Sequence, residues 1–278
     1  MRRFLLIAAA LMLAVSCAAD ADAHHTPGET ETVLTAVMYH DVLASRTGTY
    51  IVSPEQLESD IAAFAEAGYS FVSPAQVIAY AEGRGRLPAR PMLLTFDDGH
   101  YNNAYYGLPI LRKYGAKATF CVVGSYADTY TERKSERDNP AYSYLTWEEI
   151  GELSRDPLIT IAAHSYDMHG AHGRRGILPK AGESDGDYER ALTEDTERLR
   201  EKLTECTGSG GDTYAYPFGH YCAAARETLE GLGYKMFLTC NEGASTLRFG
   251  DPSCIKQVCR YNRSGAYATE SFLKKIQK

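Results

Sequence analysis

The sequence predicts an α/β fold of one domain, in which parallel strands curl into a closed or partly closed barrel. Short apolar runs typical of buried strands alternate along the chain with longer segments of helical periodicity, so successive βα units build a parallel sheet. Seven or eight such units fit within the 278 residues, a length that barrels commonly reach without a second domain. These observations favour a barrel, and a doubly wound open sheet is the alternative.

Six apolar runs are the expected strands of this sheet. They span residues 35–39, 92–96, 118–123, 159–163, 213–216 and 235–238. Cys121 lies within the third run, which places it in the expected core. The Gly-Arg-Gly of residues 83–85 follows a helical segment and lacks the later glycine of a dinucleotide-binding loop, so a Rossmann fold is not supported.

Helices are expected between the strands, and two of them have clear starting signals. The Ser-Pro-Glu-Gln of residues 53–56 is a capping box with proline at the first helical position, and Gly68 ends this helix. The Ser-Pro of residues 73–74 opens a second helix in the same way. Residues 188–203 form a longer amphipathic helix with an apolar face for the core.

The N-terminal segment is expected to direct export. Met1, Arg2 and Arg3 precede an apolar run over residues 4–15, which is too short to span a bilayer stably. Residues 14–17 (Ala-Val-Ser-Cys) also resemble a bacterial lipoprotein box, in which Cys17 becomes lipidated, whereas ordinary cleavage slightly further on is the alternative. We therefore expect residues 1–17 to be a signal peptide or lipoprotein signal, and the protein to be extracellular or in the cell envelope, with Cys17 as a candidate membrane anchor.

The segment that follows differs in composition from the rest of the chain. Residues 18–32 are small, polar and acidic, without an apolar period, which is typical of a flexible tether. The folded domain is therefore expected to cover residues 33–278. The chain holds 36 acidic and 29 basic residues, a formal charge of −7, and this balance gives no indication of nucleic-acid binding.

Cysteine usage is compatible with an exported protein. Besides Cys17 the chain contains an even number of cysteines: Cys121, Cys206, Cys222, Cys240, Cys254 and Cys259. We expect one or two disulfides plus buried thiols, with Cys254 and Cys259 as the most plausible local pair. Because no Cys-x-x-Cys pair is present, a redox motif and a zinc ribbon are both disfavoured.

Two pairs of chemically active residues follow expected strands. Asp97 and Asp98 end the strand at 92–96, and His164 follows the strand at 159–163, with His169 five residues later. In α/β folds the carboxyl ends of parallel strands carry the chemistry. Two imidazoles and one carboxylate leave open positions on a Zn²⁺-like ion, whereas structural zinc sites usually close with four protein ligands. The pattern therefore favours a catalytic metal.

Three motifs in this order resemble those of the polysaccharide deacetylase family of metal-dependent carbohydrate esterases. They are Thr-Phe-Asp-Asp-Gly at residues 95–99, His-Ser-Tyr-Asp-Met-His at 164–169 and Tyr-Ala-Tyr-Pro-Phe-Gly at 214–219. The Val-Met-Tyr-His-Asp of residues 37–41 and the Leu-Thr-Trp-Glu-Glu-Ile of 145–150 are similar to the exported poly-N-acetylglucosamine deacetylase-like branch. This resemblance implies a deformed (β/α) barrel and makes residues 33–278 the catalytic domain.

The resemblance also implies a role for each site residue. Asp98, His164 and His169 would hold the metal, with Zn²⁺ favoured and Co²⁺ or Ni²⁺ as alternatives. Asp97 would be the general base, because neighbouring carboxylates at a strand end point in different directions and only one need bind the cation. The backbone N–H of Phe218 would donate to the oxyanion.

Two departures from the family pattern need replacements elsewhere in the chain. No histidine follows residue 240, so the family's late Leu-x-His motif is missing, and the related branch assigns the general acid to the histidine of the first strand, here His40. Ala215 stands where many relatives have an arginine that braces the base. Arg260 or Arg263 is the candidate replacement, and a pair of surface arginines is the simpler interpretation of these two residues.

Together these features predict an exported, metal-dependent N-deacetylase. Its substrate would be an N-acetylglucosamine-containing polysaccharide, such as poly-N-acetylglucosamine, peptidoglycan or a chitin-like polymer, and its products a free amine and acetate. Two alternatives remain open at this stage. One is an O-acetyl esterase acting on xylan or another glycan, and the other is a non-catalytic glycan-binding surface protein that keeps the fold.

Overall fold

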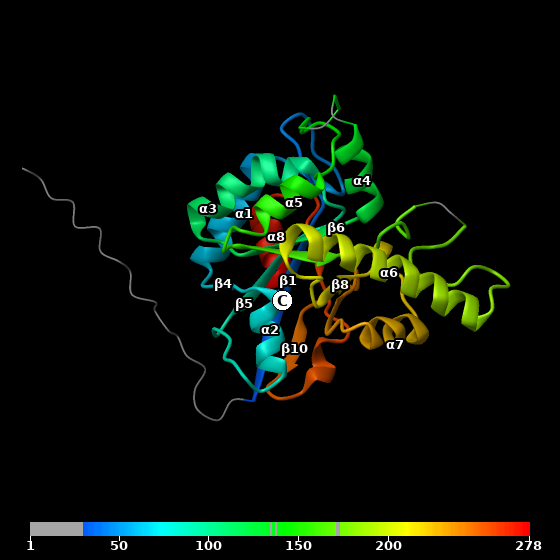
Figure 1. Cartoon of the computed structure of the whole chain (residues 1–278). Helices are drawn as coiled ribbons and strands as arrows, with labels where there is room; N and C mark the ends of the chain where they lie inside the picture. Colours follow the sequence, from blue (N-terminus) through cyan, green and yellow to red (C-terminus); the bar gives the residue numbers. More distant parts are fainter. Residues whose placement is uncertain (1–29, 134, 137, 171–172) are drawn as a thin grey trace, which may run out of the picture.

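The computed structural model describes residues 30–133, 135–136, 138–170 and 173–278, and Figure 1 shows the whole chain. The expected signal at residues 1–17, the candidate anchor Cys17 and most of the expected tether lie outside the described residues. The first strand, β1, begins at Glu31, two residues before the expected start of the folded domain. No helix within the described residues is long and apolar enough to cross a membrane.

A curled, mainly parallel sheet forms the centre of the molecule. Its order is β10-β1-β5-β6-β7-β8-β9, while β11 also pairs with β1 and β4 with β5. All neighbours are parallel except β10, which lies antiparallel to β1. The predicted single-domain, partly closed barrel of parallel strands is confirmed. The strands are β1 (Glu31–Tyr39), β4 (Ser70–Phe71), β5 (Pro91–Phe96), β6 (Ala118–Val122), β7 (Ile159–Ala163), β8 (Thr213–Ala215), β9 (Met236–Leu238), β10 (Ser245–Arg248) and β11 (Tyr261–Asn262).

A short segment near the C-terminus links the last strand of the curled sheet back to the first. Val258 bonds to the β9 backbone, because its N–H donates to the Phe237 carbonyl at 2.8 Å and its carbonyl accepts from the Thr239 N–H at 2.9 Å. A few residues later β11 pairs with β1, and the Arg263 N–H donates to the Met38 carbonyl at 2.9 Å. Residues 258–263, called the closing segment below, therefore bridge the gap between β9 and β1.

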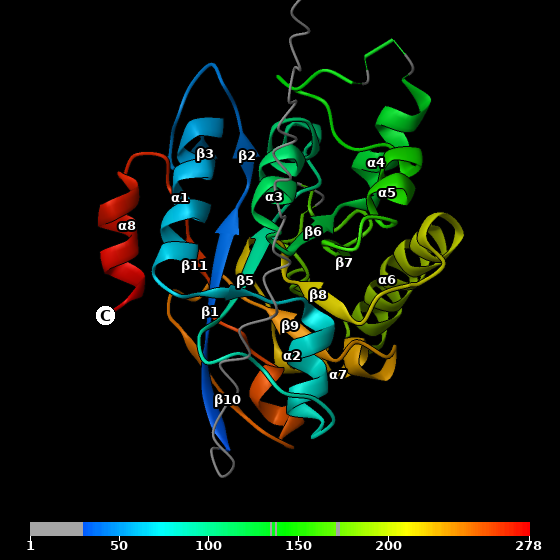
Figure 2. The ribbon, with the colours of Figure 1, turned by 90° about the vertical axis from the view of Figure 1, so that its left-hand side faces the viewer.

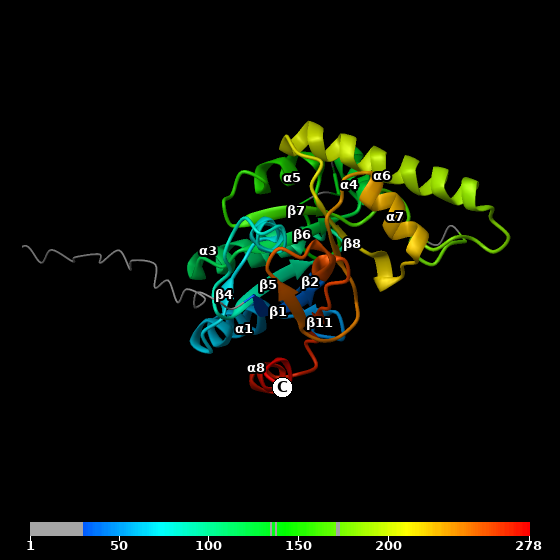
Figure 3. The same ribbon diagram turned by 90° about the horizontal axis from the view of Figure 1, so that it is seen from below.

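Helices surround the sheet, as Figures 2 and 3 show. The helix α8 lies against α1 on one side of the molecule, and α6 packs between α5 and α7 on the other. The helices are α1 (Pro54–Glu66), α2 (Pro74–Ala81), α3 (Leu108–Tyr114), α4 (Gly124–Glu132), α5 (Trp147–Leu153), α6 (Asp185–Thr207), α7 (Ala223–Gly231) and α8 (Thr269–Ile276). Short helical turns occupy η1 (Asn103–Gly107), η2 (Pro217–Gly219) and η3 (Pro252–Ile255), and a small second sheet pairs β2 (Asp41–Val42) with β3 (Ile51–Val52).

The expected helix starts are confirmed in atomic detail. In α1 the Ser53 hydroxyl accepts from the Gln56 N–H while the Gln56 side chain accepts from the Ser53 N–H. This reciprocal capping box recurs at Ser73 in α2. Each such cap contributes about 1 kcal/mol to stability. Gly68 follows the end of α1 with a φ of 80°, a left-handed conformation that suits glycine.

Alternation along the strands separates two hydrophobic clusters. Side chains on one face of the strands, such as Phe96 and Phe120, pack beneath the helices, with their rings stacked at 5.1 Å. Side chains on the other face form a second cluster with α2 and η3, which includes Leu93, Cys121 and Ala215. Cys121 is fully buried, as its position in an apolar run predicted.

The expected disulfide between Cys254 and Cys259 is not formed, and the six cysteines of the described residues are free thiols. The two residues make different local contacts. The Cys254 thiol accepts from the Arg248 N–H at the end of β10, whereas the Cys259 N–H donates to the Ser245 hydroxyl at the start of that strand. The sulfur of Cys254 therefore contacts the end of β10 and not Cys259. The disulfide predicted from proximity in the sequence was wrong.

Candidate active site

The carboxyl ends of four parallel strands bring the expected site residues into one pocket. His40 follows β1, Asp97 and Asp98 follow β5, His164 follows β7, and Phe218 lies in the turn after β8. Because these strands run parallel in one sheet, with β6 between β5 and β7, their carboxyl ends lie at the same rim of the barrel. The pocket has a volume of about 470 Å³. Its walls are Met38, His40, Asp41, Tyr50, Asp97, Asp98, His164, His169, Phe218, Cys240 and Asn262.

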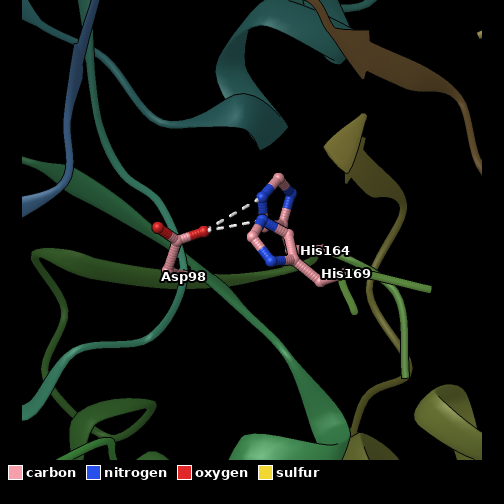
Figure 4. A group of neighbouring side chains, drawn as sticks. All are labelled: Asp98, His164 and His169. Carbon is pink, nitrogen blue, oxygen red and sulfur yellow. Dashed lines mark ion pairs between the residues drawn. The ribbon is translucent and has the colours of Figure 1, made fainter. Parts of the chain in front are cut away.

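Asp98, His164 and His169 form a group with the geometry of a cation site. Figure 4 shows both imidazoles on the same side of the carboxylate. The Oδ1 atom of Asp98 lies 3.4 Å from Nε2 of His164 and 3.0 Å from Nε2 of His169. One ligand atom from each residue lies within 4.8 Å of the others. The structure thus places together the three residues that the sequence predicted as metal ligands.

The second nitrogen of each histidine is engaged elsewhere, which leaves Nε2 free to face the centre of the group. Nδ1 of His164 donates to the Ala215 carbonyl at 2.8 Å, and Nδ1 of His169 lies 3.3 Å from the Tyr126 hydroxyl. Metal-binding histidines typically use their other nitrogen in this way, because it fixes the tautomer and the ring orientation. The donor set therefore fits a divalent ion such as Zn²⁺, with room for further ligands.

Electrostatics at this group favours an ionised carboxylate. Burial disfavours the charge of Asp98, but hydrogen bonds with His100, His164 and His169 outweigh it and hold the pKa of Asp98 well below its ordinary value. A carboxylate that stays charged at every physiological pH is suited to bind a cation.

Backbone strain concentrates at the rim of the pocket. Asp98, Ser165 and Phe218 all adopt left-handed conformations, with φ values of 71°, 75° and 57°. Residues other than glycine seldom adopt positive φ, and such conformations persist only where surrounding contacts enforce them. They occur directly after β5, β7 and β8, so the backbone turns sharply at three of the strand ends that carry site residues.

Asp97 is held by a buried arginine from the closing segment. Its Oδ1 atom accepts from Nη1 of Arg260 at 2.7 Å, and the same nitrogen donates to the Thr95 hydroxyl at 3.1 Å. Both charged side chains are almost completely buried. Although burial alone would raise the pKa of Asp97, the charges of Arg260 and His164 together lower it below its ordinary value. Asp97 is therefore ionised and fixed in direction.

The two candidate arginines have separate partners, and neither lies on the surface. Arg263 forms a two-pronged ion pair with Asp60 of α1, at 2.6 Å from Nε and 3.0 Å from Nη2. The interpretation of residues 260 and 263 as a surface pair was wrong, because both side chains are buried. Of the two candidates, Arg260 is the one that contacts Asp97.

His40 lies in the pocket wall near the paired acids. Its ring packs edge-on against Tyr50 at a centroid distance of 4.8 Å, and its buried Nδ1 atom has no hydrogen-bond partner among the described residues. Burial lowers the pKa of His40, although the nearby charges of Asp97 and Asp98 act in the opposite direction. This imidazole has one nitrogen available for a ligand in the pocket.

Phe218 lies at the pocket mouth, with 55% of its side chain exposed. Its ring lies 4.4 Å from that of His169. The turn is tightly packed from behind, because a Cβ at Gly219 would meet the backbone and sulfur of Cys240 at 3.0 Å or less. This packing fixes the backbone that carries the Phe218 N–H.

His100 makes two contacts at the site. Nε2 of His100 lies 3.6 Å from Oδ2 of Asp98, and Nδ1 of His100 lies 3.4 Å from Asp41. Asp41 also accepts from the Asn102 side chain at 2.8 Å. His100 directly follows the Asp-Asp-Gly sequence, and that proximity was the only signal available.

Comparison with protein families decides the membership of this chain. The model of the family described as polysaccharide deacetylase matches residues 84–237, which is more than half of the 278 residues. The chain belongs to the polysaccharide deacetylase family. The matched region contains β5 to β8 and with them all three residues of the cation site.

Curated relatives of this polysaccharide deacetylase family member include enzymes named poly-beta-1,6-N-acetyl-D-glucosamine N-deacetylase. The protein from Escherichia coli K12 is 26% identical over 227 residues, which are 75% of this chain and 34% of the relative. The protein from Staphylococcus aureus MRSA252 is 26% identical over 206 residues, which are 73% of this chain and 65% of the relative. The chain thus spans about a third of the length of the Escherichia coli relative.

Solved structures support the assignment of the fold. IcaB from Ammonifex degensii superimposes with a TM-score of 0.70 at 26% sequence identity, covering 84% of this chain and 93% of that protein. A de-N-acetylase from Aggregatibacter actinomycetemcomitans gives a TM-score of 0.74 at 21% identity, covering 88% of this chain and 100% of that protein. The second comparison concerns the fold alone. Both structures share the curled (β/α) barrel with this polysaccharide deacetylase family member.

Proposed function

We propose that this protein is a metal-dependent N-deacetylase that removes acetyl groups from a poly-N-acetylglucosamine-like polysaccharide. The observation that carries the proposal is the cation site of Asp98, His164 and His169 beside the ionised, arginine-paired Asp97 in one pocket. The names of the Escherichia coli and Staphylococcus aureus relatives support the substrate class. The reaction adds water to the acetamide carbon, breaks the carbon–nitrogen bond, and yields acetate and a free amine.

The cation site supplies the first requirement of amide hydrolysis. A divalent ion bound there would polarise a carbonyl oxygen and make water easier to deprotonate. Asp98 would contribute Oδ1, and the two histidines would contribute the Nε2 atoms that already face it. The hydrogen bond from His164 to the Ala215 carbonyl holds that ring in the required tautomer.

Asp97 supplies the general base. Its carboxylate accepts a proton from the attacking water, and the buried Arg260 keeps it ionised and directed into the pocket. Arg260 binds Oδ1 of Asp97, and the proposed proton acceptor is the second oxygen of the carboxylate. Arg260 thereby takes the place of the arginine that many relatives carry at the position of Ala215.

His40 and Phe218 complete the proposed reaction centre. His40 lines the pocket near Asp97 and, in its protonated form, donates a proton to the nitrogen of the leaving amine, since an amide anion is too basic to depart unprotonated. Burial disfavours this protonated form, whereas the charges of Asp97 and Asp98 favour it. The backbone N–H of Phe218, at the mouth of the pocket, donates to the oxyanion that develops on the acetyl oxygen.

Acetate release tests this function directly. Purified protein should release acetate from N-acetylglucosamine oligomers, lose the activity with a chelator, and regain it with Zn²⁺ or Co²⁺. Cleavage of acetylated xylan but not of the amide would replace the proposal with an O-acetyl esterase. Binding of the oligomer by the metal-loaded protein without any turnover would eliminate the enzymatic function.

Variants separate the base from the cation ligands. Asp97→Asn should abolish turnover yet retain one bound metal ion per chain, because Asp97 is not one of the three residues of the cation site. His164→Ala should lose turnover and metal together, because it removes one of three ligands. Metal content by atomic emission and acetate release measure the two effects. Loss of metal in Asp97→Asn would contradict the assigned division of roles.

We propose further that the protein is exported and acts outside the cytoplasm. The basic start and short apolar run of residues 1–15 support this proposal. A lipidated Cys17 would hold the enzyme at a membrane surface, and cleavage further on would release it. Fractionation of cells that express the full chain and a Cys17→Ala variant distinguishes the two, because only a lipoprotein moves from the membrane to the soluble fraction on this substitution.

A further inference from the structure

In the loop between the two histidines of the cation site, several backbone N–H groups point to one side chain, that of Asp195. His164 and His169 are separated by four residues, and Asp195 of α6 faces this loop. Oδ2 of Asp195 accepts from the Tyr166 N–H at 2.8 Å, and Oδ1 accepts from the Asp167 N–H at 2.7 Å. The Met168 N–H also donates toward this carboxylate.

Successive backbone N–H groups that converge in this way form an anion-binding concavity, and here a side chain of the same chain fills it. Without the carboxylate, these N–H groups would lose their acceptor at a partly buried position. Each buried donor left unsatisfied costs about 1–3 kcal/mol. The loop includes Ser165, whose left-handed backbone needs support from its surroundings. Asp195 therefore stabilises one backbone conformation of the loop.

The opposite side of the loop is held by the start of α4. The Gly124 N–H donates to the Ser165 carbonyl at 3.1 Å, and the Ser125 N–H donates to the Tyr166 carbonyl at 2.7 Å. A Cβ atom at Gly124 would overlap the ring of Tyr166, so glycine is required for this close approach. The loop is thus fixed on one side by α4 and on the other by Asp195.

The side chain of Tyr166 connects the same two helices. Its hydroxyl donates to Asp128 of α4, and the guanidinium of Arg198 in α6 lies 4.0 Å above its ring. Arg198 also lies 3.8 Å from the Asp128 carboxylate. These contacts connect α4 and α6 across the loop, on the helix that carries Asp195.

We infer that Asp195 is a positioning residue, which holds the loop so that both histidine Nε2 atoms meet Oδ1 of Asp98. The inference rests on the proposed function, since it concerns binding of the proposed cation. The hydrogen bonds of the Asp195 side chain go to the backbone that joins His164 to His169, and Asp195 acts on the cation ligands through this backbone. Supporting residues of this kind typically alter metal affinity 10- to 100-fold when replaced.

Titration with Zn²⁺ alone, against a chromogenic chelator, tests the inference without any need for turnover. Asp195→Asn keeps the side-chain shape but replaces one carboxylate oxygen by an NH2 group. This group cannot accept a hydrogen bond from the backbone N–H that faces it. It should weaken Zn²⁺ binding by about tenfold or more. Glu197→Gln is the matched control, because it removes an exposed carboxylate from the same helix and should leave affinity unchanged. The visible spectrum of the Co²⁺ form should change in Asp195→Asn only.

The outcomes distinguish this inference from the proposed function. Equal Zn²⁺ affinity and equal Co²⁺ spectra in Asp195→Asn and the parent protein would overturn the positioning role, even if thermal unfolding shows that the variant is less stable. If the parent protein binds no Zn²⁺, the proposed function fails and the inference fails with it. If the parent binds Zn²⁺ but releases no acetate, weaker binding by Asp195→Asn still supports the positioning role.

Discussion

At the scale of single residues, Arg260 has the clearest effect on the site. Its side chain is buried with Asp97, and the pair is stable because each charge compensates the other. The sequence could nominate Arg260 or Arg263 but could not choose between them, since both belong to one short polar stretch. The choice depends on which side chain points to Asp97 and which to Asp60. The pairing of the closing segment with β1 and β9 decides this.

Replacing Arg260 by Gln should remove activity and lower stability. Asp97 would keep its burial but lose its counter-charge, and breaking one partner of a buried pair costs about 3–5 kcal/mol. Zn²⁺ should still bind, because the three ligands remain. Urea unfolding and metal titration measure these effects. Arg190→Gln removes an exposed ion pair with Asp187 and is the control, with an expected loss within about 1 kcal/mol. Comparable losses in both variants would refute the buried-pair argument.

Replacing His40 by Ala should slow amide cleavage more than ester cleavage. General acid catalysis typically contributes about 10²- to 10⁴-fold, and the amine leaving group needs it, whereas a nitrophenolate does not. The measurement is kcat/KM on an N-acetylglucosamine oligomer and on nitrophenyl acetate. Equal reductions on the two substrates would show that His40 acts on something other than the leaving group.

At the scale of elements, hydrophobic periodicity was sufficient to predict the longer strands and helices. The six expected strands and the helices at residues 54, 74 and 188 are present, because each has a long apolar pattern or a capping signal. The short strands β4, β10 and β11 were not predicted. Two of them have only two residues, and β10 alternates buried and exposed positions over only four residues, so none of the three gives a pattern that stands out from a loop.

Asp60 illustrates an interaction that no local pattern reveals. It lies on the buried face of α1, where an acid is unexpected, and its partner Arg263 lies 203 residues later. The Tyr39 hydroxyl and the Thr269 hydroxyl also donate to it, at 3.0 and 2.6 Å. These bonds join the start of α8, the closing segment and β1 to one helix.

Asp60→Ala should therefore destabilise the protein and impair the site at a distance. The substitution leaves Arg263 buried without its partner, at a cost of about 3–5 kcal/mol, and loosens the segment that carries Arg260. Glu58→Gln on the same helix removes the charge of a surface pair with Lys113 and is the matched control. Denaturant midpoints and acetate release provide the comparison. Full stability in Asp60→Ala would contradict the view that this pair holds the closing segment.

At the scale of the whole molecule, the barrel followed from the sequence, and the expected metal site is where the strand ends meet. Binding of the proposed cation should stabilise the folded state, because the unfolded chain does not hold the three ligands together. Free Zn²⁺ at 100 times its dissociation constant adds about 2.7 kcal/mol. Thermal unfolding with Zn²⁺ and with chelator measures the shift, and His164→Ala should abolish it. A similar shift in that variant would locate the ion elsewhere.

The closing segment has a consequence for the order in which the protein matures. His40 directly follows the first strand, β1, and Arg260 directly precedes the last, β11, so the pocket joins the two ends of the folded domain. A chain that is still being synthesised acquires its cation ligands once residue 169 has emerged, but Asp97 gains its counter-charge only after residues 258–263 have reached β1. The site that surrounds Asp97 therefore stays incomplete until the closing segment has joined the sheet.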